Sequence, residues 1–299
     1  MVHSLVSIAS VLTCLASSPS PASANTPVRY RWNKGETSRY RLVAKLNGSI
    51  PIIGNADPVD LEAVLTIVYR VKPIDVKETG EAAVDFRVET AEAEVLGLPL
   101  SIPMEDARKM LDRTVTFAAT GEVLSIKEGP PSPFTLTVPG LDPQRLFSLI
   151  CPIVFPDRPV QPGDEWDFPG RLVGSPEAPA RFTARVQPTP KDTPSGGPEV
   201  RIAETFTMNI DQKLTDDKKP VTNGATPARS RTGTVTGKGV MVLDPEGGSL
   251  LRGQITIEAA IVERILGPVQ PDERAETPSK VKAVVNIRPI PPTRGKPAG

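Results

Sequence analysis

The chain has 299 residues, and its 35 lysine and arginine residues balance its 35 aspartate and glutamate residues, so its formal net charge is zero. A neutral chain has no overall field that would attract nucleic acid or an anionic membrane surface, which argues against both as partners. The only histidine is His3. The rest of the chain therefore lacks the residue most often used as a catalytic base, metal ligand or pH switch.

Residues 1–24 have the pattern of a signal peptide. An apolar run over residues 5–15 leads through serines and prolines to Ala22-Ser23-Ala24, which is typical of a small-residue cleavage site. The run is much shorter than the roughly 20 residues that span a bilayer. We therefore expect export to the periplasm or the cell exterior. Cys14 offers a lipid-anchored alternative, against which Thr13 argues because it departs from the pattern before a lipidated cysteine.

The sequence after residue 24 predicts an exported chain with no transmembrane segment. It contains no apolar stretch of 18 residues, the usual minimum for a membrane-spanning helix. Cys151 is its only cysteine, so no internal disulfide can form. Because the neighbours of Cys151 are mostly apolar, we predict a buried, unreactive thiol there.

Alternation of apolar and polar residues runs through most of the chain and predicts strands with one buried face. The alternating segments in chain order are residues 28–32, 40–46, 61–71, 82–88, 115–117, 182–186, 200–202, 206–210, 255–261 and 281–287. Many of the 34 prolines lie with glycines in turns between them, such as residues 193–198 and 244–248. The pattern predicts an all-β, antiparallel protein.

Two short helices are expected to interrupt the strands and cover the sheet. The first, over residues 103–111, places Met104, Ala107, Met110 and Leu111 on one side. The second begins after Asp142, a residue suited to cap a helix, with Pro143 at the first helical position. Its apolar residues are Leu146, Phe147, Leu149 and Ile150, and Pro152 ends it.

The sequence also suggests two related halves. The turn and strand of residues 34–40 are echoed at residues 162–166, and the hairpin of residues 119–124 is echoed at residues 245–250. We therefore predict an N-terminal β half (25–158) and a C-terminal β half (159–288), two half-sheets sharing one core as a β-sandwich. The alternative is that these echoes are common turn chemistry. The expected packing anchors are Trp32, Tyr40, Tyr69, Phe86, Phe117 and Trp166. Residues 289–299 are Pro-rich and basic, which predicts a disordered tail.

Residues 155–166, Phe-Pro-Asp-Arg-Pro-Val-Gln-Pro-Gly-Asp-Glu-Trp, resemble a motif of an uncharacterised family of bacterial exported proteins and lipoproteins. Residues 35–40 and 120–123 resemble the opening strand and central turn of the same family. The resemblance implies an exported β-rich fold and carries over no catalytic residue. More distantly, a curved antiparallel sheet closed by short helices is similar to the periplasmic lipoprotein carriers, which hold acyl chains on their concave face.

Catalytic motifs are weak throughout the sequence. Asp164, Glu165 and Asp167 form the best carboxylate cluster and leave a carboxylate-dependent hydrolase as a remote alternative. A glycine precedes them, and acidic residues beside glycine are common in turns. The sequence has no Gly-x-Ser-x-Gly motif, no zinc spacing, no regular calcium loop and no dinucleotide fingerprint. We therefore expect no enzyme activity, no catalytic residue, no metal and no cofactor.

Residues 96–104 are the best candidate for a binding surface. They are apolar but fit neither a regular strand pattern nor one helix, so they are expected to line the mouth of an apolar cavity. The alternative is a loop packed over the sheet edge. The predicted ligand-binding residues, from this stretch and the two helices, are Leu98, Leu100, Met104, Met110, Leu146 and Phe147.

The function that these observations favour is an exported, non-catalytic envelope protein that binds a lipid or another apolar ligand in a cavity of the β-sheet. Scarce aromatic residues, 4% of the chain, and abundant aliphatic ones point to an acyl chain rather than a sugar. The main alternative is an envelope scaffold that binds a protein partner and no small ligand, which the Pro-rich segments and neutral charge would suit.

Overall fold

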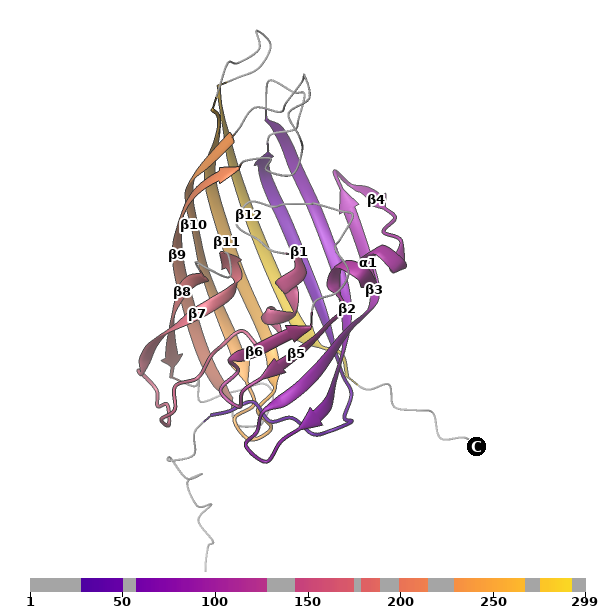
Figure 1. The fold of residues 1–299 in the computed structure, drawn as a ribbon, viewed down its shortest axis with the longest axis vertical. Coiled ribbons are helices and arrows are strands. Elements are labelled where there is room, and N and C mark those ends of the chain that lie inside the picture. Colours follow the sequence, from indigo (N-terminus) through magenta and orange to yellow (C-terminus); the bar gives the residue numbers. More distant parts are fainter. Residues whose placement is uncertain are drawn as a thin grey trace, which may run out of the picture.

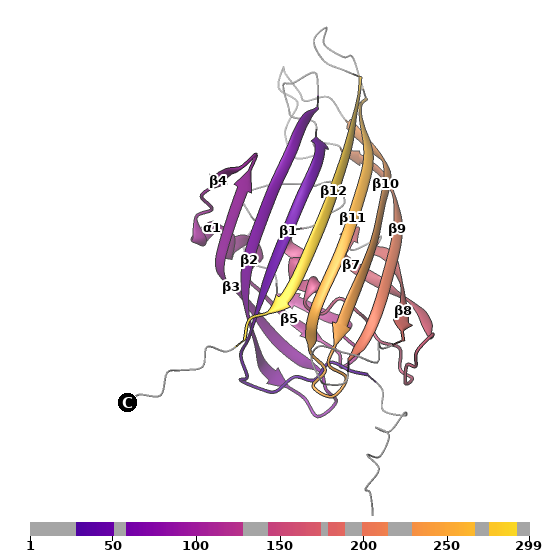
Figure 2. The same ribbon diagram turned by 180° about the vertical axis from the view of Figure 1, so that it is seen from behind.

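The protein is all-β and antiparallel, as the sequence predicts (Figures 1 and 2). The computed structural model describes residues 28–50, 58–127, 143–174, 179–188, 199–214, 229–266 and 275–291. The strands are β1 (Ser38–Ile50), β2 (Val59–Val76), β3 (Ala82–Val95), β4 (Leu98–Leu100), β5 (Arg113–Phe117), β6 (Val123–Lys127), β7 (Glu165–Gly174), β8 (Pro179–Gln187), β9 (Val200–Leu214), β10 (Arg229–Leu243), β11 (Leu250–Ile265) and β12 (Glu276–Pro289). The predicted signal peptide, residues 1–24, lies outside the described residues.

All twelve strands belong to one sheet, in the order β6-β5-β3-β2-β1-β12-β11-β10-β9-β8-β7, with β4 paired to β3. The first and last strands pair at its centre, where Tyr40 faces Pro289 and Ser49 faces Lys280. The two predicted half-sheets are therefore present and share one core. They do not stack as the two layers of a sandwich, because the β1–β12 pairing makes them one continuous sheet. Their origin by duplication stays a prediction.

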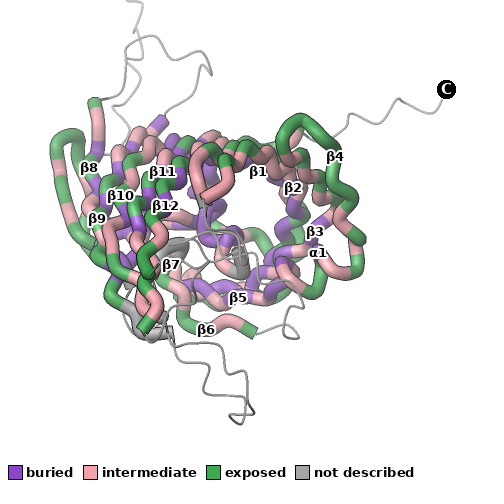
Figure 3. The backbone as a smooth tube through the Cα atoms, turned by 90° about the horizontal axis from the view of Figure 1, so that it is seen from above, coloured by how far each residue is buried: buried purple, intermediate pink, exposed green. Residues whose placement is uncertain are grey.

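The sheet curves around a central region, and Figure 3 shows β5 and β6 on the side opposite β1. Its inner face is apolar. Residues at i, i+2 and i+4 share a face of a strand, so the buried alternation of Tyr40, Leu42 and Ala44 identifies the inner side of β1. Their outward neighbours, such as Arg41 and Lys45, are exposed.

Two short helical segments complete the fold. The α-helix α1 (Met104–Leu111) begins after Pro103, buries Ala107 and Leu111, and packs against β3. The second segment, η1 (Pro143–Leu149), is a 3₁₀-helix that contacts α1 and β7. It is followed by residues 150–155, and we call η1 plus these residues the inner segment. Asp142, the predicted cap, lies outside the described residues.

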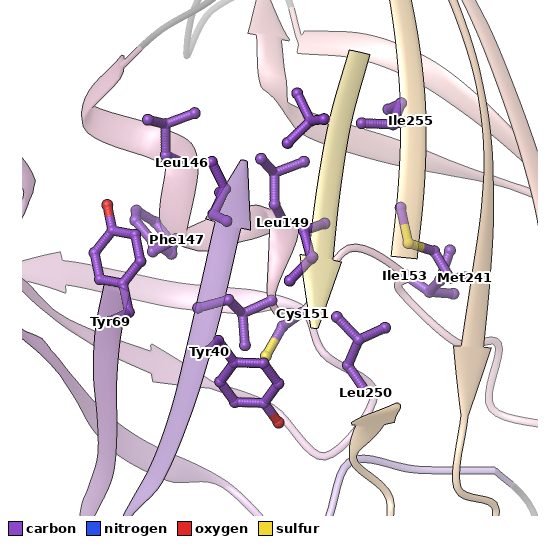
Figure 4. Packing of buried hydrophobic residues seen from close by; sticks show 14 of the residues in the cluster. Tyr40, Tyr69, Leu146, Phe147, Leu149, Cys151, Ile153, Met241, Leu250 and Ile255 are labelled. Carbon is purple, nitrogen blue, oxygen red and sulfur yellow. The ribbon is translucent and has the colours of Figure 1, made fainter. Parts of the chain in front are cut away.

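The inner segment fills one end of the curved sheet. Figure 4 shows Leu149, Cys151 and Ile153 pointing among core side chains that include Tyr40, Met241 and Ile255. Its backbone is held by the Ile153 N–H, which donates to the Tyr30 hydroxyl at 3.2 Å, and by the Phe155 N–H, which donates to the Thr120 carbonyl at 2.8 Å. Of the predicted anchors, Tyr40, Tyr69, Phe86 and Phe117 are buried, and Trp32 and Trp166 pack half-buried against them.

The C-terminal boundary differs slightly from the predicted start of the tail at residue 289. Pro289 ends β12, and the Ile290 N–H donates a hydrogen bond to the Arg39 carbonyl at 2.7 Å. The described chain thus continues in contact with β1 for two residues of the predicted tail. Residues 292–299 lie outside the described residues.

Candidate ligand-binding site

The inner face of β1–β3 changes from buried to part-exposed along the strands. Leu42 and Ile67, which face each other across β1 and β2, are fully buried. Further toward the β1–β2 connection, Leu46, Ala63 and Leu65 lie on the same face but are half-buried. At this end the sheet therefore presents apolar side chains that the described core covers only in part.

Strand β4 extends this apolar surface. Leu98 pairs with Val95 and Leu100 with Ala93, and these two β3 residues in turn pair with Ala63 and Leu65. Directly paired residues lie on the same face of a sheet. Leu98 and Leu100 therefore belong to the inner face, although they are 71% and 55% exposed. Residues 96–104 are thus less irregular than the sequence suggests, because three of them form a strand.

We call this surface the open inner face. Its members are aliphatic residues of β1–β4 that share one side of the sheet and are half-buried or exposed: Leu46, Val59, Leu61, Ala63, Leu65, Ala91, Ala93, Val95, Leu98 and Leu100. None of them is aromatic. The other side of the same strands carries charged residues, with Lys45, Glu62 and Glu94 exposed.

The six predicted ligand-binding residues occupy three different environments. Leu98 and Leu100 are exposed on the open inner face. Met104 and Met110 of α1 are half-buried against the core. Leu146 and Phe147 of η1 are buried, and the Phe147 ring lies 5.5 Å from that of Phe86, centre to centre. The two elements that carry the last four residues, α1 and η1, contact each other, whereas Leu98 and Leu100 are exposed on β4.

A separate cavity lies beside the inner segment, and none of these six residues lines it. Its volume is about 30 Å³. Its walls are Gly121, Val123, Ser148, Leu149, Cys151, Pro152, Val154, Pro169, Gly170, Phe182, Glu204 and Ile255. Val123 belongs to β6 and Gly170 to β7, the two edge strands, so this cavity lies where the two ends of the sheet approach each other.

Glu204 is the only acidic or basic residue among the described residues that line the cavity. It lies on the inner face of β9 between Ile202 and Phe206, is only 2% exposed, and its Oε2 atom has no hydrogen-bond partner. Its side chain lies against Gly239 of β10, where an added Cβ would come within 2.9 Å of Oε1. Removal from water disfavours the carboxylate and raises the pKa of Glu204 to about 8. The group is therefore a neutral acid at pH 7.

Glycines make room for the side chains around Glu204. A Cβ at Gly237 would overlap the ring of Phe206, and a Cβ at Gly170 would overlap the ring of Phe182. The Phe182 and Phe206 rings stack with their centres 4.4 Å apart. Close approach of a ring to a strand glycine is a common way to fill the space that the missing side chain leaves.

The other titratable groups near Glu204 are also buried. Burial raises the pKa of the Cys151 thiol and of the Tyr30 hydroxyl, and Glu204 is close enough to Tyr30 to raise the pKa of Tyr30 further. A thiol with a raised pKa carries little thiolate and is a poor nucleophile. The buried cysteine expected from the sequence is thus present.

The carboxylates of the cluster at residues 164–167 accept hydrogen bonds from residues in and beside their own turn. Asp164 accepts hydrogen bonds from the Arg158 guanidinium and, at 3.1 Å, from the Gln161 N–H, and the bond from Arg158 lowers the pKa of Asp164. Asp167 accepts a hydrogen bond from the Thr183 hydroxyl at 2.7 Å. These contacts match the turn role considered from the sequence.

Among the described residues, no group of three or more histidine, cysteine, aspartate or glutamate side chains is placed to hold a metal ion. In the same residues, no helix is long and apolar enough to cross a membrane.

The sequence analysis did not identify Glu204 as a site residue, although the pattern of its strand indicates one. An acidic residue interrupts the apolar positions Ile202, Phe206, Met208 and Ile210 of one strand face. An acid at an inward position of an otherwise apolar strand indicates either an error in register or a buried polar site. The structure shows the second.

Comparisons with known proteins add little. No protein family matches the chain, and no curated protein matches it. One solved structure, an outer membrane channel from Pseudomonas putida F1, aligns over 91% of this chain and 100% of that chain, at 8% identity and a TM-score of 0.20. A similarity this weak carries no argument about function.

Proposed function

We propose that this is an exported, non-catalytic envelope protein that holds an acyl chain of a lipid against the open inner face of β1–β4. The observation that carries the proposal is a continuous apolar surface, from Leu46 on β1 to Leu100 on β4, that the described core leaves part-exposed. Contiguous exposed apolar surface on a concave wall is typical of binding sites for apolar ligands.

The chemistry of this surface favours an acyl chain. Its side chains are leucine, valine and alanine, which offer no stacking surface for a sugar and no hydrogen bond for a polar ligand. Burying each methylene of a chain contributes about 0.8 kcal/mol, so six buried methylenes would contribute about 5 kcal/mol before the cost of ordering the chain. Export, which the signal-peptide pattern supports, would place the protein in a compartment where membrane lipids are available.

One observation favours the scaffold alternative. Within the described part of the chain, the short strand β4 pairs with β3 alone, and its exposed Leu98 and Leu100 could instead contact an extended segment of an envelope protein. The two functions predict different results for a free lipid chain. A lipid-binding protein retains it, whereas a scaffold does not.

A charge on the open inner face should separate these functions. We expect Leu100→Asp to weaken the binding of dodecanoate at least tenfold, because the aspartate carboxylate would have to be desolvated against the alkyl chain. Binding is measured by equilibrium dialysis at pH 7, with circular dichroism to confirm that the fold is retained.

Ile74→Asp is the matched control, because Ile74 is an exposed aliphatic residue at the opposite end of β2. It should leave the affinity for dodecanoate unchanged. Equal affinities of the wild type and the Leu100→Asp variant would exclude the open inner face as the site. No binding to any of the three proteins would favour the scaffold.

A further inference from the structure

The Glu204 cavity has two properties of a site built for a polar group. First, its wall contains Val123 of β6 and Pro169 and Gly170 of β7, the two edge strands of the described sheet. These two strands are not paired with each other in that sheet, so a ligand that enters between them separates no strand pair. Second, the Glu204 carboxyl inside is 2% exposed and its Oε2 atom has no partner. Buried polar atoms are nearly always hydrogen-bonded, so we expect this oxygen to form a hydrogen bond with a bound molecule.

The surroundings of Glu204 restrict what that partner is. Among the residues that the structure describes, the wall contains no lysine or arginine, and its other polar side chains are the Ser148 hydroxyl and the Cys151 thiol. Burial keeps the carboxyl of Glu204 protonated at pH 7. A neutral carboxyl has one O–H donor and a carbonyl acceptor, so it pairs best with a group that both accepts and donates. A metal cation would find a single carboxyl, too few oxygen ligands to replace its hydration shell, and an anion would meet no positive charge from the described wall residues.

The size of the cavity and its apolar walls restrict the ligand further. The cavity volume of about 30 Å³ is enough for one small polar group. Its walls include Phe182, Leu149 and Ile255, which suits a short alkyl segment that extends from that group toward the open side of the cavity. The group and its attachment together describe an aliphatic alcohol.

We propose that the cavity between β6 and β7 is a second binding site, distinct from the open inner face, that takes the hydroxyl group of an aliphatic alcohol through hydrogen bonds to Glu204. The alcohol donates to the unpartnered oxygen and accepts from the carboxyl O–H. The same chemistry is offered by a free short alcohol and by the hydroxyl end of a longer apolar molecule. The proposal goes beyond the acyl-chain site and does not depend on it.

The experiment titrates 1-butanol into the full chain labelled with ¹³C at the glutamate carboxyls and at the isoleucine δ1-methyl groups. The Glu204 resonance is assigned as the one missing from Glu204→Gln, and the Ile255 methyl, in the cavity wall, reports on binding in every variant. We expect both resonances of the wild type to shift and saturate. Diethyl ether, an isomer of butanol that cannot donate a hydrogen bond, should bind at least fivefold more weakly.

Variants distinguish a hydroxyl site from a merely apolar hole. Glu204→Gln keeps a donor and an acceptor, so its affinity for 1-butanol should stay within about threefold of wild type. Glu204→Leu keeps the volume but removes both groups, and we expect at least a tenfold loss at the Ile255 methyl. Equal affinity of wild type and Glu204→Leu, or no saturable shift with 1-butanol, would overturn the proposal and show that the cavity holds only water or nonspecific solute.

A second titration with 1-octanol distinguishes the two sources of the hydroxyl. Tighter binding than 1-butanol that Glu204→Leu weakens indicates the hydroxyl end of a longer chain. Affinity no tighter than that of 1-butanol, with the same dependence on Glu204, indicates a free short alcohol. Dodecanoate binding by the Leu100→Asp variant tests the open inner face separately, so failure at one site does not imply failure at the other.

Discussion

Raising the pH from 5 to 8 will lower the free energy of unfolding of the wild type by about 4 kcal/mol, and Glu204→Gln will remove most of this loss. Burial raises the pKa of Glu204 to about 8 in the folded protein, whereas an unfolded glutamate titrates near its ordinary value of about 4.3. The folded state thus binds one more proton than the unfolded state between these two values. Stability is fully present below the unfolded pKa and falls by about 1.4 kcal/mol per pH unit up to the folded pKa.

Urea denaturation at pH 5, 6.5 and 8 measures this effect. Other acids with shifted pKa values do not offset it, because the pKa values of Asp75, Glu105 and Asp164 are lowered, and these groups are ionised in both states above pH 5. Replacing the exposed Glu165 by glutamine is the control and should leave the pH dependence as in wild type. If Glu204→Gln and the wild type lose stability in parallel, Glu204 is not a buried neutral acid.

Gly121→Ala will destabilise the protein by about 3 kcal/mol, whereas Gly35→Ala will cost about 1 kcal/mol. Both glycines have left-handed backbone conformations, with φ of +89° and +80°. A Cβ at Gly121 would overlap the Tyr30 ring and lie 2.5 Å from the Ile153 carbonyl oxygen, whereas a Cβ at Gly35 meets nothing within 4 Å. The pair therefore separates the cost of backbone strain from the cost of displacing the inner segment.

The measurement is the free energy of unfolding of each variant from urea titrations. Gly163, with φ of +95° and open space around its Cβ position, provides a second control and should behave like Gly35. Similar losses for all three substitutions would mean that the contact of Gly121 with Tyr30 and Ile153 adds nothing to stability. A larger loss at Gly121 alone would show that this turn positions the inner segment.

Strands with large inward side chains could be predicted from the sequence, and strands with small ones could not. Alternation reveals β2 and β12 because Ile67, Val285 and their neighbours occupy the inward positions. In β10 three of the inward positions are Gly233, Gly237 and Gly239, so its alternation is hidden. The Phe206 ring at Gly237 and the Glu204 side chain at Gly239 come from β9, and no local pattern in β10 predicts them.

The pairing of strands that lie far apart in the sequence could not be predicted either. That β1 pairs with β12 depends on the closure of the whole sheet rather than on any residue in either strand. For the same reason the two halves were expected to stack as a sandwich. The 3₁₀ geometry of η1 was also missed, since apolar spacing over seven residues beside Pro143 and Pro152 suits an α-turn and a 3₁₀-turn alike.

The candidate site was predictable only in part. Leu98 and Leu100 were predicted to bind a ligand because they are apolar residues outside a regular pattern. In the structure both are exposed on the inner face. Composition does not distinguish them from Leu146 and Phe147, which pack into the core through η1. Whether an apolar residue lines a surface or fills a core depends on what lies opposite it, and that is set by tertiary packing.

The most direct test of the acyl-chain proposal is native mass spectrometry of the protein purified from its own cells without detergent, followed by organic extraction of whatever it carries. We expect a stoichiometric adduct of lipid or fatty-acid mass, which Leu100→Asp reduces and Ile74→Asp does not. A protein that gives only its own mass, with no extractable lipid, would contradict the proposal and point to a protein partner at β4 instead.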